Sequence, residues 1–216
     1  MALIKILGGT GYAGSHIAST GTTRGHKILS YSKNLPAEKV NGVTYITGDL
    51  RDEAFLATAC SNADVVISAL SARGPLAKEM DFRTLLRRAA LIAAQQGIRF
   101  GVIGGAGSLL RKPGGPRFVD TPEFLEIAKP EALILAAVLE DLYISDPRLD
   151  WFFVSPAANF GPHAPGKTTG NYRIGGDILL YDENGNSDLS GGDLGLAVIN
   201  EVENPEHHRK RLSVVY

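Results

Sequence analysis

The chain has 216 residues, 44% of them hydrophobic and 21% charged, and a formal net charge of −1 at pH 7. A chain of this length can bury well over half of its unfolded surface, so it needs no disulfide or metal to fold. Because the charges are balanced, no excess of basic residues is available to neutralise phosphates, and we expect no nucleic-acid partner.

The 216 residues contain one cysteine, Cys60. No disulfide can form within the chain, which favours a reducing compartment. The first residues reach Gly8 too early to provide the long apolar core of a signal peptide. No apolar run approaches the roughly 20 residues that span a bilayer. We therefore expect a cytoplasmic protein without a membrane segment.

Short apolar runs alternate with longer stretches of helical spacing. We predict strands at residues 3–7, 27–31, 43–47, 65–68, 99–103 and 150–154. We predict helices at residues 14–22, 52–60, 79–96 and 131–144. Continuously apolar strands that alternate with helices are typical of a parallel sheet covered on both faces. The order predicts an α/β fold with a doubly wound parallel sheet; the alternative, a two-layer α+β domain, requires polar–apolar alternation within the strands.

The last third of the chain departs from this alternation. We predict a loop at 159–167, short strands at 172–174 and 177–181, a helix at 194–202 and a last strand at 212–215. Asp193 stands where it could cap this last helix. We see no linker that would separate two domains. The sequence predicts one domain over residues 1–216, with a small C-terminal region, residues 159–192, as a lid on the substrate side.

A glycine-rich segment directly follows the first predicted strand and opens the first predicted helix. It reads Gly8-Gly9-Thr10-Gly11-Tyr12-Ala13-Gly14 and contains the spacing G-x-G-x-x-G. Glycine permits the tight turn and a close approach of the backbone to a pyrophosphate, and the helix N-terminus offers unpaired N–H groups. The strand before, the helix after and the next strand about twenty residues on complete the motif. We predict a dinucleotide site on a Rossmann-type sheet; the alternative is a glycine-rich turn without a ligand.

The end of the second predicted strand bears on the choice of cofactor. It reads Tyr31-Ser32-Lys33-Asn34, and no carboxylate appears before Glu38. NAD-specific folds place Asp or Glu there to bind the ribose 2′-hydroxyl. Ser32 and Lys33 instead offer a hydroxyl donor and a cation, which suit a 2′-phosphate. The residues favour NADPH over NADH, although a loop lysine such as Lys33 is often only solvated.

Further motifs occur after the later strands. They are Gly48-Asp49-Leu50, Asp64-Val65-Val66-Ile67-Ser68-Ala69-Leu70, Val102-Ile103-Gly104-Gly105-Ala106-Gly107-Ser108, Lys129-Pro130-Glu131-Ala132 and Ser155-Pro156-Ala157-Ala158. With the glycine segment they cover nearly the whole chain. On these motifs the chain resembles the atypical short-chain dehydrogenases, in particular the NmrA-like, NAD(P)H-binding branch. That branch includes provisionally assigned NADH–flavin reductases and proteins of the biliverdin reductase B type.

The resemblance implies roles for these residues. Asp49 and Leu50 would flank the adenine, and Ala69 and Leu70 would line the adenine-side ribose and the pyrophosphate. The nicotinamide would be bordered by Gly104, Gly105, Pro156, Ala157 and Ala158. Simpler interpretations remain open, because Asp49 could merely cap the following helix and Pro156 could merely end a strand.

The chain also departs from the wider superfamily. It has no Tyr-x-x-x-Lys pair, Ala128 stands where relatives often carry tyrosine, and glycines replace the serine after strand five. A ketone reductase must protonate an alkoxide, so these losses argue against alcohol–ketone chemistry. Flavins and quinones accept a hydride into conjugated rings, which spread its charge. The main task of the protein is then to orient the two planar ring systems. No catalytic residue stands out; Ser108 and His163 are the candidates, and a loop histidine is often only solvent-exposed.

Two residues are candidates for contact with an aromatic or conjugated small-molecule substrate. Phe160 could stack on it, and Arg73 could meet an anionic group or lie in a solvated loop. His207 and His208 lack the spaced partners of a metal site, so we expect no metal. The sequence predicts an NAD(P)H-dependent reductase of a conjugated acceptor. The alternative is a non-catalytic NADP(H)-binding redox sensor of the NmrA-like type, and an epimerase or hydroxysteroid-type dehydrogenase is less favoured.

Overall fold

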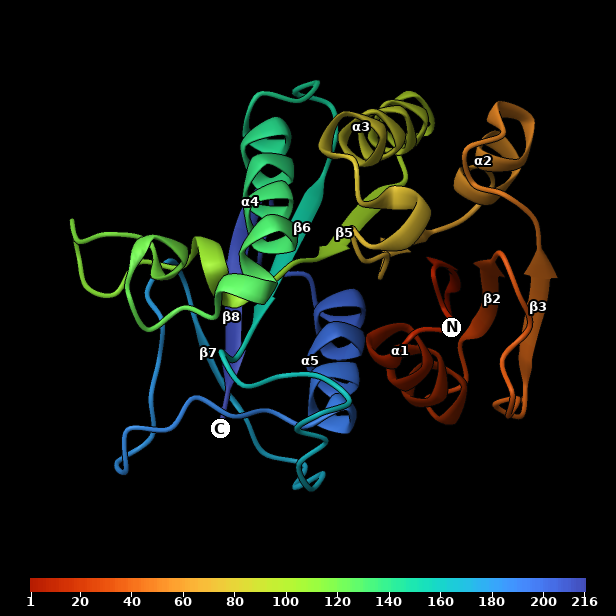
Figure 1. Ribbon diagram of the computed structural model, residues 1–216. Helices are drawn as coiled ribbons and strands as arrows, with labels where there is room; N and C mark the ends of the chain where they lie inside the picture. The colour runs from red at the N-terminus through yellow and green to blue at the C-terminus, as the bar shows by residue number, and fades with distance from the viewer.

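The computed structural model describes residues 1–216. Its strands form one sheet in the order β3-β2-β1-β4-β5-β6-β8-β7 (Figure 1). The strands are β1 (Leu3–Leu7), β2 (Lys27–Ser32), β3 (Val43–Thr47), β4 (Val65–Ser68), β5 (Arg99–Ile103), β6 (Trp151–Pro156), β7 (Arg173–Gly175) and β8 (Lys210–Val215). All neighbouring pairs are parallel except β7 and β8, which are antiparallel. The predicted doubly wound parallel sheet is confirmed.

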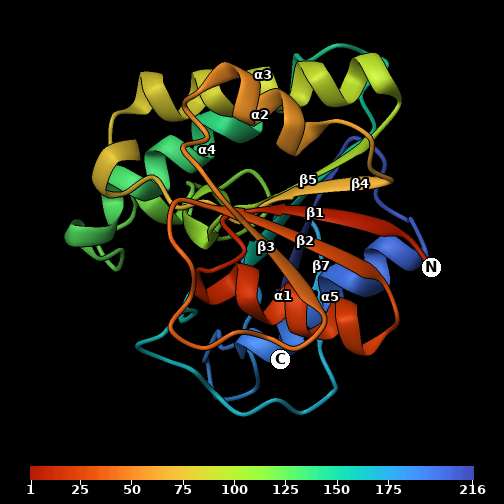
Figure 2. The same cartoon turned by 90° about the vertical axis from the view of Figure 1, so that its right-hand side faces the viewer.

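Helices cover both faces of this sheet. They are α1 (Tyr12–Thr23), α2 (Glu53–Cys60), α3 (Glu79–Gln96), α4 (Lys129–Tyr143) and α5 (Gly191–Glu203). Figure 2 shows α1 and α5 on one face and α2, α3 and α4 on the other. Each face holds its own apolar core, which explains why central strands such as β4 and β5 are buried at every residue. None of the helices combines the length and the apolar composition that crossing a bilayer requires.

Two helices are capped by residues other than the candidate acids Asp49 and Asp193. Asp52 caps α2 by accepting a hydrogen bond from the backbone N–H of Phe55 at 2.8 Å, so Asp49 is not the capping acid. Ser190, and not Asp193, caps α5, because its hydroxyl accepts from the backbone N–H of Asp193 at 3.0 Å. A serine directly before the first turn is a typical N-cap. Asp193 is the third residue of α5, and its buried carboxylate accepts hydrogen bonds from other groups.

The predicted strand at 177–181 is wrong. The segment makes a single bridge, between Ile178 and Leu110, and Leu179 packs in a small cluster with Ala106 and Leu109. Its apolar residues therefore reflect burial against the loop after β5. The Asp177 carboxylate is bound by a guanidinium of β8 at 2.6 Å, which ties the segment to the sheet edge without strand pairing.

Candidate functional site

The glycine segment folds into a tight turn between β1 and α1. Gly8 has a φ of +81°, which favours glycine, and Gly11 donates its N–H to the Gly8 carbonyl at 3.0 Å. A Cβ on Gly14 would overlap the backbone of Gly8 and Gly9, so α1 packs directly on the turn. A Cβ on Gly11 would meet only the Gly8 carbonyl oxygen, at 3.4 Å. Gly11 therefore leaves an open approach to the backbone.

The first turn of α1 adds unpaired donors to this approach. Its N-cap residue is Gly11, no side chain caps the helix, and no acidic residue lies in the first turn. The first N–H groups of a helix need partners from outside the helix, and they carry partial positive charge. The turn thus presents free donors to an anion.

A cavity of about 270 Å³ lies beside the turn. Its lining includes nine of the residues predicted to bind the cofactor, namely Gly8, Thr10, Gly11, Ser32, Lys33, Asp49, Leu50, Ala69 and Leu70. They follow the carboxyl ends of β1, β2, β3 and β4, four neighbouring strands. In doubly wound sheets, ligands bind at this edge where the strand order reverses, here between β1 and β4.

Two polar groups of the cavity, Ser32 and Asp49, are held by hydrogen bonds within the protein. The Ser32 hydroxyl accepts a hydrogen bond from the backbone N–H of Thr10 at 3.3 Å. Lys33 is exposed and forms no ion pair. Asp49 accepts from the backbone N–H and Nε of Arg51, both at 3.0 Å, and these hydrogen bonds lower the pKa of its carboxyl to about 2. The cavity wall is therefore cationic around one ionised carboxylate.

Sequence reasoning missed Arg51, which also lines the cavity. It lies in the turn between β3 and α2, two residues after Asp49. The pattern Asp-x-Arg in a turn allows the guanidinium to fold back onto the carboxylate, and this signal was present in the sequence.

Arg73 lines the same cavity, and it is paired with an acid of α4 that does not line the cavity. Its Nε donates to Oε2 of Glu131 at 2.6 Å, and Glu131 lies in the first turn of α4. The pair joins the loop after β4 to the motif Lys129-Pro130-Glu131-Ala132. The Arg73 side chain remains 74% exposed. The structure thus places this candidate substrate residue between the cavity and α4.

The predicted nicotinamide-side residues follow the next two strands. The N–H of Gly104 donates to the carbonyl of Val154 at 2.8 Å, so the ends of β5 and β6 are bonded together. A Cβ on Gly104 would overlap the Phe153 ring, whereas a Cβ on Gly105 would make only an ordinary contact with Leu135, at 3.7 Å. On β6 and beyond it, Pro156 and Ala157 are buried and Ala158 is exposed. These residues share the edge of the sheet with the cavity but do not line it.

Ser108 and His163 have different surroundings. The Ser108 hydroxyl accepts from Nη1 of Arg211 at 2.9 Å, and Arg211 also binds Asp177. Ser108 thus belongs to an ion-pair network on the β8 side of the sheet. His163 is exposed in the loop after β6.

Phe160 follows β6 and packs on Tyr12 at the start of α1, where Ala13 also lies. The ring centroids of Phe160 and Tyr12 are 5.4 Å apart in an edge-to-face arrangement. Ala13 packs against the core shared by α1 and α5. Phe160 therefore stands next to the glycine turn, where it can border a bound molecule.

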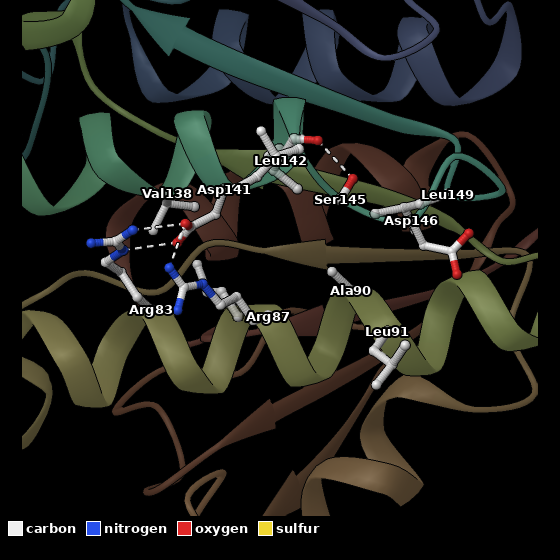
Figure 3. Close-up of a pocket in the computed structure, with 12 residues that line it drawn as sticks. Arg83, Arg87, Ala90, Leu91, Val138, Asp141, Leu142, Ser145, Asp146 and Leu149 are labelled. Atoms are coloured by element: carbon white, nitrogen blue, oxygen red, sulfur yellow. Dashed lines mark hydrogen bonds and ion pairs between the residues drawn. The ribbon is translucent and has the colours of Figure 1, made fainter.

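A second cavity, of about 330 Å³, lies between α3 and α4 (Figure 3). It contains none of the predicted site residues. Its one strongly buried acid, Asp141, is already neutralised by Arg83 and Arg87, at 2.7 and 2.6 Å. No group of three or more potential metal ligands is gathered anywhere in the chain. The glycine turn and its cavity are therefore the candidate site.

Several known proteins are similar to this chain in sequence and in fold. YwnB of Bacillus subtilis (strain 168) is 32% identical over 213 residues, which are 98% of this chain and 97% of YwnB. The crystal structure of SP1627 from Streptococcus pneumoniae TIGR4, provisionally assigned as an NADH-flavin reductase, is 31% identical. It superposes with a TM-score of 0.83 over 100% of this chain and 99% of SP1627. A provisionally assigned epimerase from Bacteroides thetaiotaomicron is 29% identical, with a TM-score of 0.86 over 99% and 96% of the two chains.

The family comparison agrees with these relatives. The model of the NAD(P)H-binding family matches residues 8–205, which begin at the first glycine of the turn and end after α5. This match supports the resemblance to the atypical short-chain dehydrogenases. The chain belongs to the NAD(P)H-binding family.

Proposed function

We propose that the protein is an NADPH-dependent reductase of a conjugated acceptor such as a flavin or a quinone. One observation carries the proposal: the glycine turn, Ser32 and the unpaired Lys33 line a single cavity at the carboxyl edge of the sheet. No acid stands between the end of β2 and Glu38 to bind a 2′-hydroxyl. The provisional assignment of SP1627 as an NADH-flavin reductase supports the same class of activity.

The residues present fit a dinucleotide. Gly11 leaves the backbone open, and the uncapped first turn of α1 offers N–H donors to a pyrophosphate. Lys33 offers a cation to a 2′-phosphate, and Asp49 and Leu50 line the side on which the adenine would lie. Gly105 and Ala158 remain open at the neighbouring strand ends. The cofactor would then extend across the edge from β3 to β6.

A bound NADPH would supply the hydride, so that the acceptor gains two electrons. The proton that completes its reduction would come from solvent after the hydride has been transferred. The chain's own residues would orient the two planar ring systems and exclude solvent. No tyrosine acid is assigned to this reaction. Tyr143 packs edge-on against Trp151, the first residue of β6, and therefore lies at the opposite edge of the sheet.

Residues 159–192 are proposed as the lid on the substrate side of this single domain. Phe160 stands beside Tyr12 at the start of α1, which places the segment next to the glycine turn. Asp193 anchors the segment, because its carboxylate accepts from the backbone N–H groups of Thr169 and Gly170 at 2.9 and 2.8 Å. The cytoplasm remains our proposed compartment, since the single cysteine, Cys60, is buried and unpaired.

The experiment is NADPH oxidation followed against FMN, riboflavin, a set of quinones and a simple ketone. We expect turnover with at least one flavin or quinone and none with the ketone. Binding of NADPH without oxidation by any acceptor would instead support the redox-sensor alternative, which the lack of a proton donor also suits. Absence of NADPH binding would overturn both functions. Preferential reduction of the ketone would overturn the proposed acceptor class.

A further inference from the structure

The guanidinium of Arg51 is held by Asp49, but not all of its N–H donors are hydrogen-bonded. Its Nε donates to both carboxylate oxygens of Asp49, at 3.0 and 3.1 Å, and Nη2 binds the same carboxylate. Nη1 has no hydrogen-bond partner. A guanidinium has five N–H donors in a rigid fork, so one edge of Arg51 remains available for a second anion.

The strand order brings Arg51 and Lys33 to the ends of two neighbouring strands. Ser32, the last residue of β2, pairs with Thr47, the last residue of β3, and its carbonyl accepts the N–H of Gly48 at 3.1 Å. Lys33 and Arg51 follow these two bonded strand ends and line the same cavity. Both lie on the β3 side of the glycine turn, away from β4. A pyrophosphate at the first turn of α1 would therefore leave them to the adenosine half of the ligand.

The charge balance of the cavity indicates what they would bind. Arg73 is paired with Glu131 and Arg51 with Asp49, whereas Lys33 has no carboxylate partner. The hydrogen bonds from Arg51, together with the charge of Lys33, keep the pKa of Asp49 well below its usual range. The carboxylate therefore stays ionised at neutral pH and continues to orient the guanidinium. A cationic excess beside an oriented, half-free guanidinium suits a phosphate group and not a neutral hydroxyl.

We propose that Arg51 determines cofactor specificity by binding the adenosine 2′-phosphate together with Lys33, while Asp49 positions its guanidinium. This inference rests on the proposed function, because it assumes an NADPH site at the glycine turn. It adds Arg51, from the turn after β3, to Ser32 and Lys33 at the end of β2 as groups that would bind the 2′-phosphate.

The test is titration calorimetry with two adenosine fragments, 2′,5′-ADP and 5′-AMP, which differ by the 2′-phosphate. Arg51→Met should weaken the binding of 2′,5′-ADP at least about tenfold, as expected for loss of a charge-assisted hydrogen bond. Its binding of 5′-AMP should stay within about twofold of the wild type. Arg51→Lys keeps the charge but loses the fork, so its affinity for 2′,5′-ADP should fall between those of the wild type and Arg51→Met.

The chain offers a matched control in Arg148. The backbone N–H and Nε of Arg148 donate to Asp146 at 2.9 and 3.0 Å, which repeats the Asp-x-Arg geometry in the turn between α4 and β6. Arg148→Met should leave the binding of both fragments unchanged. The melting temperature of each variant, measured in parallel, verifies that it is folded.

Three outcomes would overturn the inference. The first is equal binding of the two fragments by the wild type, and the second is unchanged binding of 2′,5′-ADP by Arg51→Met. The third is an equal loss for both fragments in Arg51→Met, which would assign the residue to the adenine or the 5′-phosphate. These results are independent of acceptor reduction. If the protein oxidises NADPH and Arg51→Met leaves the binding of 2′,5′-ADP unchanged, this inference is wrong and the proposed function stands.

Discussion

The hydroxyl of Tyr12 accepts a hydrogen bond from the backbone N–H of Gly191 at 3.2 Å, across 179 positions of sequence. The same hydroxyl donates to the carbonyl of Pro165 at 3.3 Å. Tyr12 is the first residue of α1 and Gly191 the first of α5. The helix that follows the glycine turn, α1, is thus bonded to the segment 159–192 and to α5.

Replacing Tyr12 with phenylalanine should loosen this segment. The two lost hydrogen bonds should lower the free energy of unfolding by about 1 kcal/mol and speed proteolysis within residues 159–192. Urea denaturation and limited proteolysis measure the two effects. Tyr143→Phe is the control, because the Tyr143 hydroxyl makes no hydrogen bond in the structure. Equal proteolysis rates for the two variants would show that Tyr12 does not anchor the segment.

Gly11 and Gly14 should respond differently to substitution. Gly11→Val adds atoms in open space, so the variant should fold but lose at least tenfold in NADPH affinity. Gly14→Ala pushes a methyl group into the backbone of the turn and should cost about 1–3 kcal/mol of stability. NADPH fluorescence titration and thermal melting separate the two effects. Undiminished NADPH binding by folded Gly11→Val would contradict the assigned position of the pyrophosphate.

Lys33 should distinguish the two cofactors. Lys33→Met should cost about 1 kcal/mol or more in NADPH affinity, in the range of hydrogen bonds to charged groups, and leave NADH binding nearly unchanged. Lys27→Met is the matched control, since Lys27 is an exposed lysine at the opposite end of the same strand. Equal affinities of the wild type for NADPH and NADH would refute the predicted preference.

No single tyrosine should be essential for turnover. Tyr143 lies at the far edge of the sheet, and the Tyr172 hydroxyl accepts from Asn200 at 2.6 Å, nine residues along α5 from the end that meets Tyr12. Phenylalanine at position 12, 143 or 172 should leave kcat within about tenfold, below the 10²–10⁴ that loss of a general acid costs. A thousandfold loss of kcat in a variant that still binds NADPH would reveal a missed proton donor.

A buried ion pair at the amino edge of the sheet should make stability depend on pH. Glu201 is 3% exposed; it accepts from Arg99 and lies 2.7 Å from Nδ1 of His207. Burial opposes its ionisation, but the hydrogen bonds from Arg99 and His207 outweigh burial and lower its pKa below 4.5. Because the pKa is lower in the folded state, the stabilisation is complete above about pH 4.5 and is lost as the pH falls through the folded pKa.

Glu201→Gln should therefore destabilise the protein by about 2–3 kcal/mol at pH 7, and the deficit should shrink at pH 3, where the carboxyl of the unfolded chain is protonated. Urea denaturation at both pH values measures it. Glu203→Gln is the control: Glu203 is 25% exposed and pairs with Arg24 and His26, so its loss should cost less. A deficit for Glu201→Gln that is equal at pH 7 and pH 3 would show that its ionisation does not stabilise the fold.

The sequence by itself determined the parallel core and the glycine turn. The six predicted strands became β1 to β6 within two residues of their predicted ends. Central strands such as β4 and β5 are buried at every residue, and a strand buried on both faces must be largely apolar. Gly8 and Gly14 stand where the turn needs a positive φ or a direct backbone contact, and glycine alone meets these needs cheaply. Such requirements act within a few residues, so their spacing is visible in the chain.

Only the tertiary structure decided which side chains share a site. Arg73 meets Glu131 and Tyr12 meets Gly191 because separate strand ends and helix ends converge on one edge of the sheet. Residues 177–181 do not form a strand, because their backbone hydrogen bonds are made with Leu110, which is distant in sequence. Pairings between distant residues depend on the closure of the whole sheet. No local pattern of residues encodes them.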